Sequence, residues 1–113
     1  MKVSIITVCF NSASTIRDAI SSVISQSYPD IEYIIVDGGS TDGTLDIIRA
    51  HSSYLSNWIS EPDNGTYDAM NKGIRLATGD IIGILNSDDQ YTSNQVLQLV
   101  HDKFKDSNID AAY

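Results

Sequence analysis

Two adjacent carboxylates, Asp88 and Asp89, follow an apolar run in the stretch ILNSDDQ. Like charges in contact repel by about 1 kcal/mol in water, and more strongly in a partly dry crevice. A hard divalent cation such as Mg²⁺ or Mn²⁺ relieves that repulsion, since it prefers carboxylate oxygens and often bridges a protein to a diphosphate. Successive side chains on an extended backbone face opposite ways. We therefore expect one carboxylate to bind a metal and the other to bind a neighbouring hydroxyl.

The alternative interpretation of this pair is structural, because acids are also favoured in the first turn of a helix. The next helix is expected to begin nearer Thr92 or Ser93, which are better N-cap candidates. The metal interpretation is therefore preferred.

A third acid, Asp37, ends an earlier apolar run and precedes two glycines. Glycines let a ligand approach the backbone closely, and an acid at such a strand end commonly accepts a hydrogen bond from a nucleotide. An Asp that only forms the turn is the open alternative. Phe10, after the first apolar run, is either a core residue or an aromatic ring that covers a base.

Polar residues also crowd the segment NGTYDAMNKG, which is expected to begin a helix. Lys72 and the positive end of that helix suit a negatively charged ligand. Asp68 and Asn71 lie in the same first turns, and folding alone gives little reason for so many polar groups there.

Apolar runs and amphipathic patterns alternate along the chain. The predicted strands cover residues 3–8, 32–37, 54–60 and 80–85, with a fifth opening at 109–113. The predicted helices cover 16–26, a short segment around 45–48 capped by Thr41 or Asp42, a segment from Ala69 to Ala77 closed by Gly79, and a segment from Val96 to Phe104.

This alternation predicts an α/β, Rossmann-like domain over residues 1–113, with a mainly parallel sheet covered by helices on both faces. Right-handed crossovers bring the carboxyl ends of parallel strands to one edge, where ligands bind. The polar and aromatic residues expected at that edge are Thr7, Phe10, Asn11, Asp37, Asp42, Glu61, Asp63, Asn64, Asn86, Ser87, Asp88 and Asp89.

Composition excludes some partners. The formal net charge of −8 disfavours nucleic acid and anionic membrane surfaces, although a metal ion can reverse the field at one site. Cys9 is the only cysteine, so no intrachain disulfide forms. It is expected to be a small buried residue. The apolar opening is too short to span a membrane, so a cytoplasmic location is expected.

Three motifs, in this order, resemble those of family 2 glycosyltransferases, which have the GT-A fold. They are SIITVCFNSASTIRDAISSVISQSYPDIEYIIVDGGSTDGT, NGTYDAMNKG and ATGDIIGILNSDD. The resemblance runs over almost the whole chain. It implies metal-dependent, inverting transfer of a sugar from a nucleotide-sugar, usually a UDP-sugar and in some members a dTDP- or GDP-sugar, to an acceptor hydroxyl in polysaccharide or glycoconjugate synthesis.

The resemblance also implies roles for individual residues. Thr7, Phe10 and Asn11 would line the base pocket, and Asp37 would bind the base. Asp89 would be the principal metal ligand, with Asp88 on the ribose or assisting the metal, and Asp68, Asn71 and Lys72 would lie near the sugar-diphosphate. Two positions depart from the family pattern, since many relatives carry Asp at Asn86 and Arg at Met70. Asn86 is therefore not counted as a ligand.

Members of this family continue well beyond the equivalent of residue 113. Their second half carries the acceptor pocket and the general base. We therefore expect the chain to hold the donor half and to transfer little by itself, so no catalytic base is assigned. The acceptor would be a carbohydrate or a lipid-linked sugar at the inner face of the membrane. An uncovered sheet edge would also favour homo-oligomers.

Two other classes remain open. A non-catalytic nucleotide-binding module would share the fold and the pocket. A phospho-acceptor receiver domain also gathers acids at strand ends, but its acidic pair follows the first strand, which here ends in VCFN. No G-x-G-x-x-G or G-K-S/T motif supports a dinucleotide-dependent oxidoreductase or an NTPase.

Overall fold

The structure, a computed structural model, describes residues 2–91, 95–99 and 102. Its strands are β1 (Val3–Cys9), β2 (Ile31–Asp37), β3 (Asn57–Ser60) and β4 (Ile81–Ile84). Its helices are α1 (Ile16–Ile24), α2 (Thr44–Ala50) and α3 (Thr66–Leu76), with a 3₁₀ turn η1 (Ser52–Tyr54). Residues 96–99 and 102 are helical as well.

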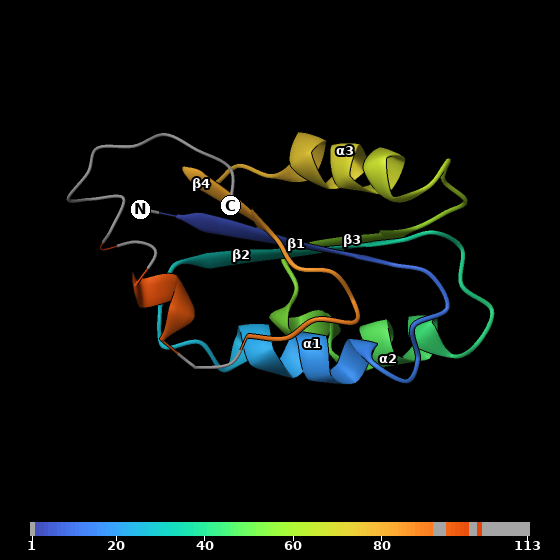
Figure 1. The fold of residues 1–113 in the computed structure, drawn as a ribbon, viewed down its shortest axis with the longest axis horizontal. Helices are drawn as coiled ribbons and strands as arrows, with labels where there is room; N and C mark the ends of the chain where they lie inside the picture. Colours follow the sequence, from blue (N-terminus) through green and yellow to red (C-terminus); the bar gives the residue numbers. More distant parts are fainter. Residues whose placement is uncertain (1, 92–94, 100–101, 103–113) are drawn as a thin grey trace.

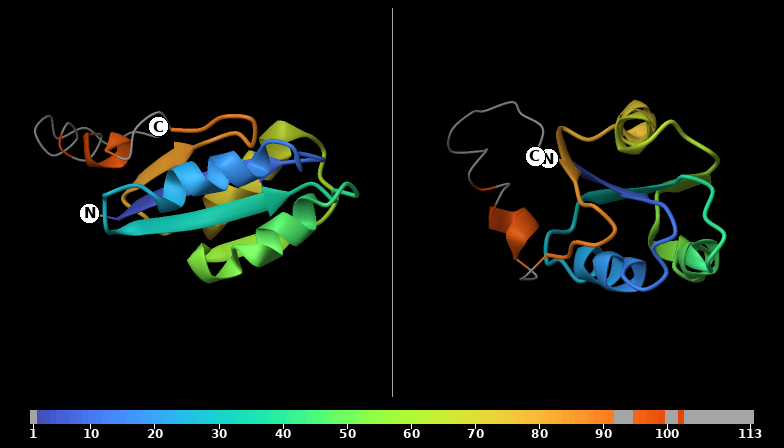
Figure 2. Two further views of the ribbon diagram at one scale, coloured as in Figure 1. Left: turned by 90° about the horizontal axis from the view of Figure 1, so that it is seen from below. Right: turned by 45° about the vertical axis from the view of Figure 1, so that its right-hand side comes forward.

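The strands form one parallel sheet in the order β3-β2-β1-β4. α3 covers one face, and α1 and α2 cover the other (Figures 1 and 2). The predicted α/β architecture is therefore confirmed. Among the described residues, no helix has the length and apolar character that a membrane span requires.

Alternation along β1 divides the core into two clusters. Val3, Ile5 and Cys9 pack with the residues of α1 and α2, whereas Ile6 and Val8 pack with Ala69 of α3 and the residues beside it. β1 is buried along its whole length, as expected for a central strand with helices on both sides.

Two predicted boundaries are wrong. The strand predicted over 54–60 begins only at Asn57, because η1 occupies the residues up to Tyr54. The helix predicted to close at Gly79 ends at Leu76, and its C-cap Ala77 is extended. The predicted strand at 109–113, the cap candidates Thr92 and Ser93, and most of the last predicted helix lie outside the described residues.

Hydrogen bonds of Glu32, here called the latch, join the start of β1 to Thr78 in the chain before β4. The Glu32 carboxylate accepts from the Ser4 hydroxyl at 2.7 Å, and from the Thr78 amide and hydroxyl at 2.8 Å each. Burial acts to raise the pKa of Glu32, but these bonds outweigh it and hold the pKa below its usual value. The latch ties the chain before β4 to the start of the sheet.

Glu32→Gln is expected to lower the free energy of unfolding by about 1–2 kcal/mol at pH 7, because charge-assisted hydrogen bonds become neutral ones. A depressed pKa stabilises the fold above the unfolded-state value of about 4.3, and this contribution is lost as pH falls through the folded-state pKa. Urea denaturation at pH 7 and at pH 3 tests this. A deficit equally large at both pH values would contradict it.

Candidate functional site

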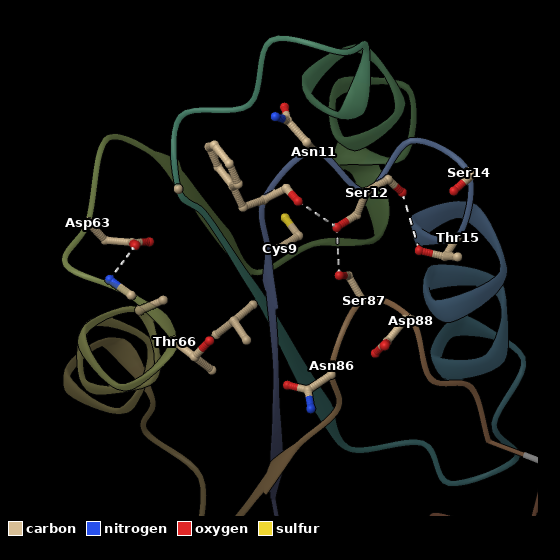
Figure 3. Close-up of a pocket in the computed structure, with 15 residues that line it drawn as sticks. Cys9, Asn11, Ser12, Ser14, Thr15, Asp63, Thr66, Asn86, Ser87 and Asp88 are labelled. Carbon is tan, nitrogen blue, oxygen red and sulfur yellow. Dashed lines mark hydrogen bonds between the residues drawn. The ribbon is translucent and has the colours of Figure 1, made fainter.

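A cavity of about 740 Å³ opens at the carboxyl ends of the strands (Figure 3). Its walls come from the loops after β1, β2, β3 and β4, from the N-cap of α1 and from the first turn of α3. Its lining residues are Val8, Cys9, Phe10, Asn11, Ser12, Ser14, Thr15, Gly38, Asp63, Gly65, Thr66, Ala69, Asn86, Ser87 and Asp88.

Side-chain hydrogen bonds join the loops around this cavity. Asn11 has a φ of 48°, and its backbone N–H donates to the Ser40 hydroxyl at 2.8 Å. Its side-chain oxygen Oδ1 accepts from the backbone N–H of Thr41 at 2.9 Å. The Ser12 and Ser87 hydroxyls lie 2.8 Å apart and connect the loop after β1 with the loop after β4. These bonds hold the cavity walls in place.

Asp37 ends β2 directly before the cavity-lining Gly38 and is fully buried. Its Oδ1 accepts from the Ser40 hydroxyl at 2.5 Å and the Cys9 thiol at 3.4 Å. Its Oδ2 accepts from the amides of Gly39 and Ser40 and from the Ser60 hydroxyl, at 3.2, 2.9 and 2.8 Å. These bonds use the acceptor capacity of the carboxylate. Asp37 therefore organises the turn after β2, and the prediction that it also binds a base receives no support from this geometry.

The protonation states around Asp37 follow from these bonds. Burial acts to raise its pKa, but the hydrogen bonds from Ser40, Ser60 and Cys9 outweigh burial and hold the pKa below its usual value. Burial, followed by the neighbouring charge of Asp37, raises the pKa of the Cys9 thiol. The thiol therefore stays protonated and donates to the carboxylate, in agreement with the structural role expected for Cys9.

Of the two adjacent acids, Asp88 lines the cavity, whereas Asp89 is not among the lining residues. Both are exposed, and the Asp89 amide donates to the Asn86 carbonyl at 3.0 Å in a turn that follows β4. Within the described part of the chain, no group of three or more metal-ligating His, Cys, Asp or Glu side chains occurs. The donor set nevertheless fits Mg²⁺ or Mn²⁺, because such ions are commonly held by one or two carboxylates, waters and substrate phosphates.

Phe10 lines the cavity as predicted, and its side chain is 62% exposed. The Phe10 ring lies beside Gly38, and Asp63 approaches the same glycine from the loop after β3. A bare glycine backbone, an exposed aromatic ring and a carboxylate thus share one part of the cavity wall.

Lys72 does not line the cavity. Its ammonium lies 3.1 Å from a Glu61 carboxylate oxygen and 3.7 Å from Asp68, and it donates to the Pro62 carbonyl at 3.2 Å. Asp68 accepts from the Asn64 amide at 3.0 Å. Lys72 and Asp68 therefore brace the loop that leads into α3, while Asn71 is exposed on α3.

Thr7 also lies outside the cavity lining, because it faces the core on the α1 side. Its hydroxyl is 2.8 Å from the buried Tyr33 hydroxyl. Of the predicted nucleotide-sugar ligands, the structure thus brings Phe10, Asn11 and Asp88 together in the cavity. The other predicted ligands do not line the cavity; they are Thr7, Asp37, Asp68, Asn71 and Lys72.

The sequence patterns gave no role to Ser14, Thr15, Gly65 or Thr66. These residues line the cavity because α1 and α3 both begin beside it (Figure 3). Their signal was their place after a strand and at the start of an amphipathic helix, where free backbone amides gather.

The family model described as "Glycosyl transferase family 2" matches residues 4–113. An uncharacterized glycosyltransferase of Mycobacterium tuberculosis is 40% identical over 96 residues, which cover 84% of this chain and 37% of the relative. A PGL/p-HBAD biosynthesis glycosyltransferase of Mycobacterium bovis is 40% identical over 89 residues, which cover 76% of this chain and 35% of the relative. The chain thus spans little more than a third of the length of these relatives.

Solved structures show the same fold. TarS 1-349 of S. aureus in complex with UDP-GlcNAc has a TM-score of 0.86 at 25% identity, over 96% of this chain and 32% of that one. The mannosyltransferase PcManGT from Pyrobaculum calidifontis was solved in complex with GDP-Man and Mn²⁺. It has a TM-score of 0.76 at 29% identity, and the match covers 82% of this chain and 29% of that one. These neighbours confirm the predicted GT-A fold, and the family assignment rules out a receiver domain. The chain belongs to glycosyl transferase family 2.

Proposed function

We propose that this chain is the donor-binding half of a glycosyltransferase and that its cavity takes the nucleoside diphosphate of a sugar nucleotide. The observation that carries the proposal is the cavity itself, which lies at the carboxyl ends of parallel strands and is walled by an exposed ring, amides, hydroxyls and Asp88. Its volume of about 740 Å³ is within the range of small-molecule sites. UDP is the nucleotide we test first, because TarS 1-349 was solved with UDP-GlcNAc.

The charge of the cavity wall supports metal dependence. Among the described residues that line it, Asp63 and Asp88 are acidic and none is Lys or Arg. A diphosphate would therefore meet net negative charge, which a divalent cation reverses. Asp88 and Asp89 would hold that cation, with Asp89 as its principal ligand. The cation would stabilise the negative charge of the departing nucleoside diphosphate.

The rest of the reaction is assigned to sequence that follows this chain. We propose inverting transfer to an acceptor hydroxyl, in which a general base beyond residue 113 removes the proton of that hydroxyl. A carbohydrate or lipid-linked acceptor of polysaccharide or glycoconjugate synthesis, used at the cytoplasmic face of a membrane, is consistent with the second half expected of this family. The 113-residue chain is expected to bind the donor without efficient turnover.

Calorimetric titration with UDP, with and without Mn²⁺, tests the donor site. Mn²⁺ is expected to tighten UDP binding by about tenfold or more, and Asp89→Asn is expected to abolish that gain. Asp88→Asn is expected to weaken binding only when Mn²⁺ is present, because it removes the second carboxylate of the proposed cation site. Asp46→Asn changes an exposed carboxylate on α2, 4.0 Å from Arg49, and serves as the matched control.

The outcomes separate the alternatives. Binding of UDP without any effect of Mn²⁺ or of Asp89→Asn would contradict the metal site. Metal-dependent binding, with neither transfer nor hydrolysis of a UDP-sugar by a chain that includes the following half, would instead favour the non-catalytic binding module.

A further inference from the structure

The loop of residues 86–90 follows β4 and carries the proposed cation site, Asp88 and Asp89. β4 itself pairs with β1, so the chain is well held up to this loop. Within the described part of the chain, the loop makes one hydrogen bond to a residue outside itself. That bond is the 2.8 Å contact between the Ser87 and Ser12 hydroxyls. Hydrogen bonding therefore ties the two acids to the rest of the cavity at a single point.

Ser12 is a rigid anchor for this contact. Its amide donates at 2.8 Å to the hydroxyl of Thr44, which is fully buried. Its carbonyl accepts from the Thr15 amide at 3.0 Å, just before α1 begins. Its hydroxyl donates to the Phe10 carbonyl at 3.2 Å, so Ser87 supplies the proton in the contact between the two hydroxyls. The loop after β4 is thus attached to a residue whose backbone and side chain are both fixed.

Ser87 directly precedes Asp88, and both residues line the cavity beside α1 (Figure 3). A rotation of the loop about the end of β4 would carry the Asp88 carboxylate away from the other cavity walls. A cation site loses affinity when its ligands are not held in the productive geometry, because part of the binding free energy is then spent on ordering them. The contact between Ser12 and Ser87 is placed to order the loop before a ligand arrives.

We propose that Ser87 is a positioning residue of the proposed cation site, and that it orders Asp88 and Asp89 by donating to the Ser12 hydroxyl. This inference rests on the proposed function and deepens it, because it makes the metal-dependent part of nucleotide binding depend on an uncharged contact between positions 75 residues apart. Ser87 acts through the two acids in this role and is not itself a metal ligand. Its hydroxyl therefore affects the Mn²⁺ gain, which is the ratio of the UDP affinities with and without Mn²⁺.

Ser87→Ala removes the hydroxyl, and calorimetric titration with UDP, with and without Mn²⁺, measures the consequence. The Mn²⁺ gain is expected to fall about 3- to 10-fold, the range of one hydrogen bond. Ser12→Ala is expected to lower the gain by a similar factor, and the double variant no further, because both substitutions remove the same contact. Ser87→Thr keeps a hydroxyl and is expected to keep the gain.

Ser25→Ala is the matched control. The Ser25 hydroxyl donates to the Ser22 carbonyl at 3.4 Å at the other end of α1, so its removal should leave the Mn²⁺ gain unchanged. In an Asp89→Asn background, Ser87→Ala is expected to have no further effect on the gain, since the principal cation ligand is already absent.

The outcomes separate a positioning role from a structural one. If Ser87→Ala weakened UDP binding equally with and without Mn²⁺, the gain would be unchanged and the inference overturned, with the contact left as a support of the cavity wall. Failure of Ser87→Thr to keep the gain would also overturn it. Absence of any Mn²⁺ gain in the unaltered chain would instead contradict the proposed cation site, and the inference with it.

Discussion

Asp37→Asn is expected to lower the free energy of unfolding by about 3–5 kcal/mol. The carboxylate is fully buried and accepts from Cys9, Gly39, Ser40 and Ser60. An amide in its place presents two donors to groups that are themselves donors. Urea denaturation followed by Trp58 fluorescence measures the loss.

Asp42→Asn is the matched control in the same turn. Asp42 accepts from Ala13 and Thr44 but is exposed. Since Asn replaces Asp well before a helix, the loss there should be much smaller than for Asp37→Asn. Similar losses for the two substitutions would show that burial of Asp37 does not decide the effect.

The stability difference between the unaltered chain and Asp37→Asn is expected to depend on pH. Because the pKa of Asp37 is depressed in the fold, its contribution is present above the unfolded-state value of about 3.9 and is lost as pH falls through the folded-state pKa. The stability gap between the unaltered chain and Asp37→Asn should therefore narrow on acidification below that range.

Gly79→Ala is the second substitution with a large expected effect, about 2–4 kcal/mol of lost stability. A Cβ atom at Gly79 would clash with the Ser4 hydroxyl, and would lie 2.8 Å from the Ser4 amide nitrogen and 3.0 Å from the Lys2 carbonyl oxygen. Two of these atoms belong to the backbone at the start of β1, so relief requires β1 and the chain before β4 to separate. Thermal unfolding followed by circular dichroism reports the loss.

Gly43→Ala separates crowding from backbone strain. Gly43 has a φ of 103°, yet a Cβ atom there would meet nothing within 4 Å. Its substitution should therefore cost only the strain of that conformation, about 1–2 kcal/mol. A larger loss of stability for Gly43→Ala than for Gly79→Ala would contradict the prediction. It would show that close packing between β1 and the segment before β4 does not determine the cost.

The order and type of the elements were predictable because strands and helices carry different hydrophobic periods. β1, β2, β4, α1 and α3 lie within a few residues of their predictions. The errors arose where one residue type has two uses. Gly79 resembled a helix C-cap but serves close packing against Ser4. The strand predicted over 54–60 starts late, at Asn57, because η1 takes the residues up to Tyr54.

The candidate site was predictable as an edge of the sheet but not residue by residue. Spacing identified Phe10, Asn11 and Asp88, which line the cavity. Spacing could not show that the acceptor capacity of Asp37 is used within its own turn, nor that Asp63 comes to lie over Gly38 from a loop on another strand. Such contacts depend on the three-dimensional path of each loop, which the local sequence pattern does not specify.

The hydroxyl contact between Ser12 and Ser87 joins positions 75 residues apart. The cavity is therefore complete only when β4 has docked beside β1, which closes a long loop of the chain. A molecule that binds this cavity binds the native state alone, and by mass action it adds about 2.7 kcal/mol of stability at a concentration one hundred times its dissociation constant. A ligand of this cavity would thus also lower the fraction of chains that are unfolded and open to proteolysis.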